Sequence, residues 1–167
     1  ELGFELYVLN EQVLNLWNSL FNTTIDLKPI GLAARNTLRL EKGFCLYGND
    51  IEENTSPLEA GLGWITKLST NFINSKNLTN QKNNGLKTKL IGFEILGKGI
   101  ARKDYLIFDK NQNKIGVVTS GTMSPSLNKA IGMAYINIEY NKPNQEFMIQ
   151  VRNNFILAKV AELPFVK

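Results

Sequence analysis

The stretch YLIFDKNQNKIGVVTS, residues 105–120, decides the fold class of this 167-residue chain. Apolar and β-branched residues alternate with polar ones over 105–109 and again over 114–119, which predicts two strands. The segment from Asp109 to Asn113 is polar and rich in asparagine, as is typical of a hairpin connection. We therefore expect an antiparallel pair of strands here.

The same period of two recurs through the C-terminal half of the chain. Further strands are predicted at 90–96, 131–138, 146–151 and 155–161. Six short strands without long helices favour a small closed or sandwiched β domain of roughly 80 residues. Ser124-Pro125 starts at most one helical turn inside this domain.

The N-terminal part of the chain mixes helices with a strand. Residues 3–9 predict a strand, and Asn10 is expected to cap a helix whose apolar residues recur at helical spacing. A second helix is expected over residues 31–42, ended by Gly43. Because the chain starts within a strand pattern, we expect it to be a fragment.

A third helix signal is Ser56-Pro57-Leu58-Glu59, in which Ser56 and Glu59 have the spacing of a capping box. A short helix toward Trp64 should follow. Residues 69–88 are rich in asparagine, lysine, serine and threonine, which indicates an exposed connection that includes a surface helix. The predicted organisation is therefore a first domain over 1–68, a connection over 69–88 and a β domain over 89–167.

Composition excludes several kinds of site. The chain has one cysteine and no histidine, so it can form no internal disulfide, no His/Cys metal site and no histidine acid or base. No phosphate-binding glycine loop is present, and no apolar run has the length of a membrane span. A net charge of +4, spread along the chain, makes a nucleic-acid surface the weakest of the readings.

Several motifs occur in a fixed order along the chain. They are Gly3-Phe4-Glu5, Gly31-Leu32-Ala33-Ala34-Arg35, Leu38-Arg39-Leu40-Glu41, Leu46-Tyr47-Gly48-Asn49-Asp50-Ile51, Pro57-Leu58-Glu59-Ala60-Gly61-Leu62, Gly116-Val117-Val118-Thr119-Ser120-Gly121, Ser124-Pro125-Ser126-Leu127 and Leu163-Pro164-Phe165-Val166. In this order they resemble the glycine cleavage T-protein family from the first residue to the last. Related folate-dependent dimethylglycine, sarcosine and tRNA-modifying proteins share only some of these motifs.

The resemblance implies an α+β fold, in which the second half of a ferredoxin-like folate-binding domain precedes a C-terminal antiparallel β-barrel. It also implies an aminomethyltransferase of glycine catabolism and one-carbon metabolism. Such an enzyme transfers a methylene group from the aminomethyl-lipoyl H protein to tetrahydrofolate and releases ammonia, without a metal. The family's assisting aspartate lies upstream of this chain, so no catalytic residue is expected here and the isolated chain should be inactive. A bacterial cytoplasm is expected, or a mitochondrion in a eukaryote.

Two residues carry over from the family as folate ligands. Glu5 matches the glutamate that binds the pterin, and one carboxylate can accept from the adjacent ring N–H and amino group of a pterin. Arg35 matches a folate-contacting arginine, whose planar fork suits carbonyl or carboxylate oxygens. Without the resemblance, Glu5 would be interpreted as an exposed strand residue.

Three further residues have two readings each. Tyr47 and Trp64 either stack on folate or belong to the core, and Arg102 either faces the family's central hole or lies on the surface. For Arg39 we expect an ion pair with Glu41 or Asp50. The family usually has Asp where this chain has Asn36, and we expect this loss of charge to alter how Arg35 is held.

Overall fold

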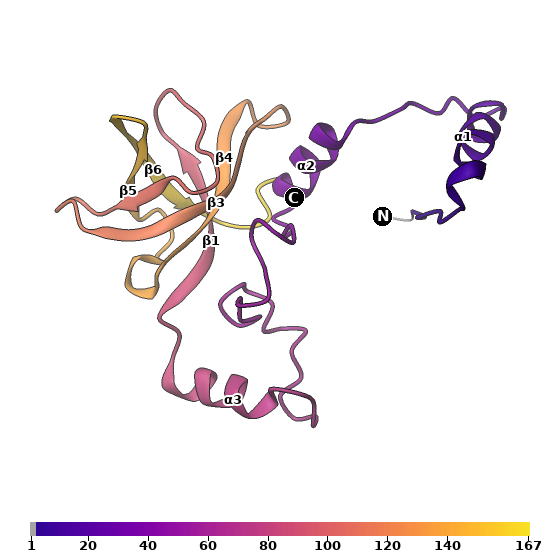
Figure 1. The fold of residues 1–167 in the computed structure, drawn as a ribbon. Coiled ribbons are helices and arrows are strands. Elements are labelled where there is room, and N and C mark those ends of the chain that lie inside the picture. Colours follow the sequence, from indigo (N-terminus) through magenta and orange to yellow (C-terminus); the bar gives the residue numbers. More distant parts are fainter. Residues whose placement is uncertain (1–2) are drawn as a thin grey trace. The chain divides into compact units, whose positions relative to one another are not determined.

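Six antiparallel strands close into a barrel in the C-terminal half of the chain, as the computed structural model shows for residues 3–167 (Figure 1). The strands are β1 (Thr88–Ile95), β2 (Leu106–Phe108), β3 (Lys114–Ser124), β4 (Lys129–Asn137), β5 (Glu146–Val151) and β6 (Asn154–Ala161). Their order around the barrel is β1-β4-β3-β2-β5-β6, and β1 pairs with β6 to close it. The predicted β domain is therefore a closed barrel.

The predicted hairpin between β2 and β3 is confirmed. The Asp109 amide donates to Asn113 O at 3.0 Å, and Asp109 Oδ1 accepts from the amides of Asn111 and Asn113, both at 2.8 Å. Hydrogen bonds from Asn113 are the main reason that the pKa of Asp109 is lowered, although burial opposes them. Gln112 occupies the left-handed region, with φ 63°, which a tight asparagine-rich turn requires.

Two apolar clusters stabilise the barrel. The interior is filled by side chains such as Phe93 and Phe147, whose rings meet edge to face with centroids 6.1 Å apart. The second cluster lies on the opposite face of β1 and β4, where Leu90, Ile131 and Met133 pack with Leu40. Because successive strand residues point to opposite faces, one pair of strands can serve both clusters.

The helix that supplies Leu40 is α2 (Leu32–Glu41), close to the predicted 31–42. It ends as predicted, because Gly43 adopts φ 68° and its amide donates to Leu40 O at 2.8 Å. The end of the chain packs against the same place. The Val166 amide donates to Glu41 O at 3.0 Å, and Leu163 packs against Gly43.

The segment between α2 and the barrel contains α3 (Ser75–Asn84), which is the expected surface helix. Within the barrel, a 3-10 helix, η2 (Ile138–Tyr140), follows β4. The helix predicted from Ser56 toward Trp64 is wrong, because the chain makes only turns there and Gly61 has φ 76°. Glu59 is not a capping-box partner either: its Oε1 accepts from Thr88 Oγ1 at 2.8 Å, which fixes the turn to the start of β1.

The chain forms one compact unit up to Leu32 and a second from Ala33 to Lys167. The first contains the 3-10 helix η1 (Asn10–Gln12) and α1 (Val13–Phe21), in which the Trp17 and Phe21 rings lie 4.8 Å apart. The strand predicted over 3–9 is wrong, and Asn10 begins η1 without forming a side-chain cap. A strand needs a hydrogen-bonded neighbour, and among the described residues 3–167 none pairs with residues 3–9.

The apolar side chains of this first unit are largely exposed. None of residues 3–32 is buried, and Phe4 and Tyr7 are 87% and 88% exposed. None of the helices among residues 3–167 is both long enough and apolar enough to cross a membrane.

Candidate functional site

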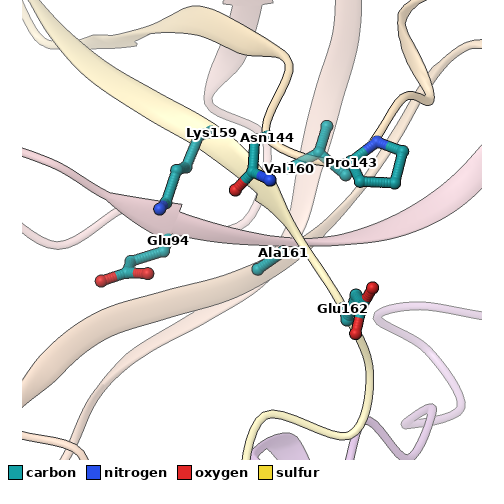
Figure 2. Close-up of a pocket in the computed structure, with 7 residues that line it drawn as sticks. All are labelled: Glu94, Pro143, Asn144, Lys159, Val160, Ala161 and Glu162. Atoms are coloured by element: carbon teal, nitrogen blue, oxygen red, sulfur yellow. The ribbon is translucent and has the colours of Figure 1, made fainter.

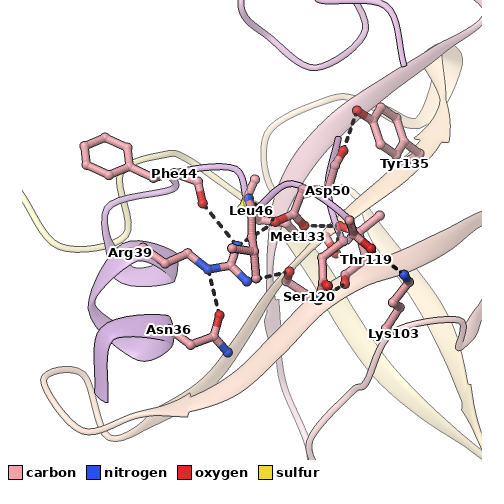
Figure 3. A network of polar contacts seen from close by, with 12 residues as sticks. Asn36, Arg39, Phe44, Leu46, Asp50, Lys103, Thr119, Ser120, Met133 and Tyr135 are labelled. Carbon is pink, nitrogen blue, oxygen red and sulfur yellow. Dashed lines mark hydrogen bonds and ion pairs between the residues drawn. The ribbon is translucent and has the colours of Figure 1, made fainter. Parts of the chain in front are cut away.

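The most elaborate polar site in the structure surrounds the Arg39 side chain at the C-terminal end of α2 (Figure 3). Arg39 Nη1 donates to Asp50 Oδ2 at 2.6 Å and to Phe44 O at 3.1 Å, and Nη2 donates to Ser120 Oγ at 2.8 Å. The Arg39 and Asp50 side chains are only 9% and 0% exposed. The predicted pairing of Arg39 with Glu41 or Asp50 is therefore confirmed, with Asp50 as the partner.

The sequence Leu46-Tyr47-Gly48-Asn49-Asp50 forms the turn that delivers this carboxylate. The amides of Asn49 and Asp50 donate to Leu46 O at 3.1 and 2.8 Å, and Gly48 takes φ 84°. In return, the Leu46 amide donates to Asp50 Oδ2 at 2.9 Å. Burial raises the pKa of Tyr135, so its hydroxyl keeps its proton and donates to Asp50 O at 2.9 Å.

A β-bulge in β3 supplies the remaining partners. Val118 pairs with Ala134 and Ser120 with Met133, so Thr119 is the extra residue. Strict alternation would turn Ser120 to the barrel interior with Val118, but the bulge lets Ser120 reach Arg39 of α2 while Thr119 reaches Asp50. Thr119 Oγ1 donates to Asp50 Oδ1 at 2.5 Å, and Ser120 accepts from Arg39. We call Arg39, Asp50, Thr119 and Ser120 the Arg39 network.

A second buried anchor involves Glu41, two residues after Arg39. Its carboxylate accepts from Ser124 Oγ at 2.5 Å and from Ser126 Oγ at 2.9 Å. Burial raises the pKa of Glu41, but the hydrogen bonds from these serines outweigh burial and the net shift is downward. Glu41 is therefore ionised at neutral pH although its side chain is buried.

Two of the predicted folate residues lie on loops that meet beside the Arg39 network. Lys103 Nζ donates to Gly48 O at 2.7 Å, which links the loop of Arg102 to the turn of Tyr47. Arg102 Nη1 donates to Gly121 O at 3.2 Å, next to the bulge. Arg102 is exposed and has further N–H groups that could bind a ligand. Both alternatives, a surface residue and a ligand-binding residue, are therefore still open for Arg102.

The aromatic candidates are not core residues in this chain. Tyr47 is 66% exposed and Trp64 is 75% exposed, so neither ring packs in the apolar core of residues 3–167. Tyr47 lies beside the Arg39 network, whereas Trp64 lies on the turns that precede α3. Their ring faces are available for stacking.

Arg35 and Glu5 fall in different compact units, so their predicted convergence on one folate stays a prediction. Arg35 is exposed, one helical turn before Arg39 on α2. Glu5 Oε2 accepts from the Tyr7 hydroxyl at 2.6 Å, and this bond raises the pKa of Tyr7. A carboxylate has about four acceptor positions, so Glu5 keeps capacity for further donors.

The Asn36 side chain contacts Arg39, while its expected effect on how Arg35 is held stays a prediction. Its side-chain Oδ1 accepts from Arg39 Nε at 2.8 Å, so the exchange of the family's aspartate for asparagine bears directly on Arg39. Any effect on Arg35 would have to pass through the helix.

None of the predicted folate residues lines the two pockets described next, although Gly63, the neighbour of Trp64 in the sequence, lines the larger one. One pocket of about 230 Å³ on the barrel is shown in Figure 2, and another of about 670 Å³ lies between the turns before α3 and the end of that helix. The lining of the first is Glu94, Pro143, Asn144, Lys159, Val160, Ala161 and Glu162. Neither pocket is lined by Arg35, Tyr47, Trp64 or Arg102. Within residues 3–167, no three His, Cys, Asp or Glu side chains gather as a metal site would require.

The sequence did not predict Ser120, Ser124 and Ser126 as partners of α2, or Thr119 as the partner of Asp50. The predicted strand 114–119 stops where the bulge interrupts the alternation, although β3 continues to Ser124. The available signal was the run of small polar residues after Val118, which is unusual on the face of a strand that packs against a helix.

Comparison with known proteins gives matches along almost the whole chain. The family model described as "GCVT N-terminal domain" matches residues 1–70, and "Glycine cleavage T-protein C-terminal barrel domain" matches residues 88–167. Proteins named aminomethyltransferase are similar to 99% of this chain, at 53% identity in Flavobacterium psychrophilum and 50% in Halothermothrix orenii. The chain spans 46% and 47% of the length of these two relatives.

A solved structure agrees with these matches. The crystal structure of glycine cleavage system aminomethyltransferase T from Bartonella henselae superposes with a TM-score of 0.85 at 32% identity. The superposition covers 93% of this chain and 44% of that one. The expected α+β class with a C-terminal barrel is therefore confirmed. This chain belongs to the glycine cleavage T-protein family, and it matches the C-terminal half of the family's aminomethyltransferases.

Proposed function

We propose that this chain forms the C-terminal half of an aminomethyltransferase. The complete enzyme would transfer the methylene carbon of an aminomethyl-lipoyl group, carried by the H protein, to tetrahydrofolate and release ammonia. The observation that carries this proposal is 53% identity, over 99% of the chain, to a protein named aminomethyltransferase. Glycine catabolism in a bacterial cytoplasm, or in a mitochondrion if the source is eukaryotic, is the proposed setting.

In this proposal Glu5 accepts hydrogen bonds from the pterin, and Arg35 binds folate oxygens. Tyr47 and Trp64 offer exposed aromatic faces, and Arg102 offers N–H donors beside the turn of Tyr47. These chemical types suit a folate, which combines a planar donor-rich ring with carbonyl and carboxylate oxygens.

We assign no catalytic residue to this chain, because the family's assisting aspartate belongs to the other half of the enzyme. The chain would therefore supply part of the folate pocket and little chemistry. The domain division at 68 and 89 is part of the same proposal.

The test is an assay of the full-length protein, with aminomethyl-loaded lipoylated H protein and tetrahydrofolate. We expect 5,10-methylenetetrahydrofolate and ammonia in equal amounts, dependent on H protein, and no turnover by the 167-residue chain alone. Arg35→Ala should raise the dissociation constant for tetrahydrofolate by roughly tenfold or more, because a charge-assisted hydrogen bond is lost. A folded full-length protein without H-protein-dependent turnover would refute the proposal.

The same protein should be offered dimethylglycine and sarcosine. Oxidative demethylation of either, together with inactivity toward H protein, would favour a related folate-dependent enzyme. Salt-dependent retention of RNA, with no folate binding, would favour a nucleic-acid function.

A further inference from the structure

Helix α2 is attached to the barrel at one end only. Its residues 32–35 are exposed, whereas Arg39, Leu40 and Glu41 are buried at its C-terminal end. Leu40 is in the apolar cluster on β1 and β4, with 0% of its surface exposed. The orientation of the exposed part of α2 therefore depends on how these last residues are held.

The polar contacts on either side of Leu40 fix two separate points of β3. Arg39 reaches Ser120 at the bulge, and Glu41 reaches Ser124 at the end of the strand. These two serines are four residues apart, which is roughly 13 Å along a strand. Two fixed points and an apolar contact define the direction of the helix axis.

The guanidinium of Arg39 is held on several sides. Besides Ser120 it contacts Asp50, Phe44 O and Asn36, and Figure 3 shows it pointing from α2 into the group formed by Asp50 and Ser120. Asp50 is itself held by the Leu46 amide and by Thr119 of the bulge. Within residues 3–167, no buried side-chain nitrogen or oxygen lacks a hydrogen-bond partner.

Arg35 lies one turn before Arg39, roughly 6 Å along the helix axis. A tilt of about 10° at the anchored end would move the Arg35 backbone by roughly 1 Å, and a displacement of that size is enough to weaken a positioned contact severely. We propose that Arg39 and Asp50 are positioning residues for folate binding, because they set the direction in which α2 presents Arg35. This inference rests on the proposed function of Arg35.

The test is a double-mutant cycle in the full-length protein, with Arg39→Lys and Arg35→Ala alone and combined. Arg39→Lys keeps the charge next to Asp50 but loses the fork that reaches Ser120, Phe44 and Asn36 together. We expect it to raise both the dissociation constant and the KM for tetrahydrofolate roughly three- to tenfold. The KM for aminomethyl-loaded H protein should not change. In the Arg35→Ala background, Arg39→Lys should have almost no further effect.

Two controls separate positioning from loss of stability. The unfolding midpoint of each variant is measured, and tetrahydrofolate titrations are run well below it. Lys110→Ala breaks an exposed ion pair with Glu146 and should leave folate binding unchanged. Ser120→Ala, which removes one bond of the Arg39 network, should weaken folate binding less than Arg39→Lys does.

The outcomes also distinguish this inference from the proposed function. If the wild-type protein does not bind tetrahydrofolate, the proposed function fails. If Arg35→Ala binds tetrahydrofolate normally, the proposed folate contact of Arg35 fails, and the positioning role fails with it. If Arg35→Ala weakens binding but Arg39→Lys does so by the same factor with and without Arg35, only the positioning role is wrong. An unchanged folate affinity for Arg39→Lys would also overturn it.

Discussion

Removal of the Asp50 carboxylate should be far more damaging than neutralisation of its charge. Asp50→Ala leaves Arg39 as a buried charge without its counter-ion, and it also leaves the Leu46 amide without its acceptor. Loss of one partner of a buried ion pair costs about 3–5 kcal/mol of unfolding free energy. We expect a value of about 4 kcal/mol for Asp50→Ala.

Asp50→Asn should cost much less, because the hydrogen bonds can be kept. The amide oxygen can accept from Arg39 and Leu46, and the amide nitrogen can donate to Thr119 Oγ1. The Thr119 hydroxyl can then turn to Met133 O, which lies 3.1 Å away. What is lost is the difference between a charged and a neutral hydrogen bond, about 1 to 1.5 kcal/mol.

Urea unfolding of the 167-residue chain, followed by circular dichroism of the barrel, measures both values. For a slope of about 2 kcal/mol per molar urea, the midpoint should fall by roughly 2 M for Asp50→Ala and roughly 0.5 M for Asp50→Asn. The control is the exposed ion pair of Lys110 and Glu146. Lys110→Ala should change the unfolding free energy by less than about 0.5 kcal/mol. Equal losses for the two Asp50 variants, or a loss below about 1 kcal/mol for Asp50→Ala, would refute the reasoning.

Three further predictions concern other parts of the structure. Because the pKa of Glu41 is lower in the folded state, its ionisation stabilises the fold at pH values above the unfolded pKa of about 4.3. This stabilisation is lost as the pH falls through the lower folded pKa. The unfolding free energy, measured in urea from pH 5 to 3, should therefore decline less steeply for Glu41→Gln than for the wild type. Parallel declines of the two proteins would contradict this. Gly132→Ala should lower the unfolding free energy by about 2 kcal/mol or more, because a Cβ there would overlap the Phe93 ring in the barrel interior; an unchanged thermal midpoint would count against the packing described. Asn36→Asp should raise the unfolding free energy by about 0.5 kcal/mol, because its bond from Arg39 becomes charge-assisted, and a lower midpoint in urea would show that Asp50 already satisfies Arg39.

The barrel was largely predictable from the sequence because its signals are local. Each strand has alternation over a few residues, and the Asp109 to Asn113 connection has the composition of a hairpin. The strand predicted over 3–9 was wrong because a strand depends on a distant partner. It forms only beside a second strand, and the sequence of residues 3–9 does not identify that strand.

In the Arg39 network, the ion pair of Arg39 was predictable from the sequence, but Thr119 and Ser120 were not. An arginine four residues from Arg35 on a helix needs an acceptor, and Asp50 was one of two candidates. The identity of Thr119 and Ser120 depends on the bulge, which shifts the strand register by one residue and so reverses the face that each following side chain occupies. A pattern of period two contains no information about where that shift occurs.

The contact between Val166 and the end of α2 has a practical consequence. The Val166 amide and carbonyl both bind this helix end, through Glu41 O and Lys42 Nζ, while Lys167 is exposed. An affinity tag or a fluorescent fusion attached beyond Lys167 can leave toward solvent. Trimming the chain before Phe165, as is often done to aid crystallisation, would instead loosen the helix that presents Arg35.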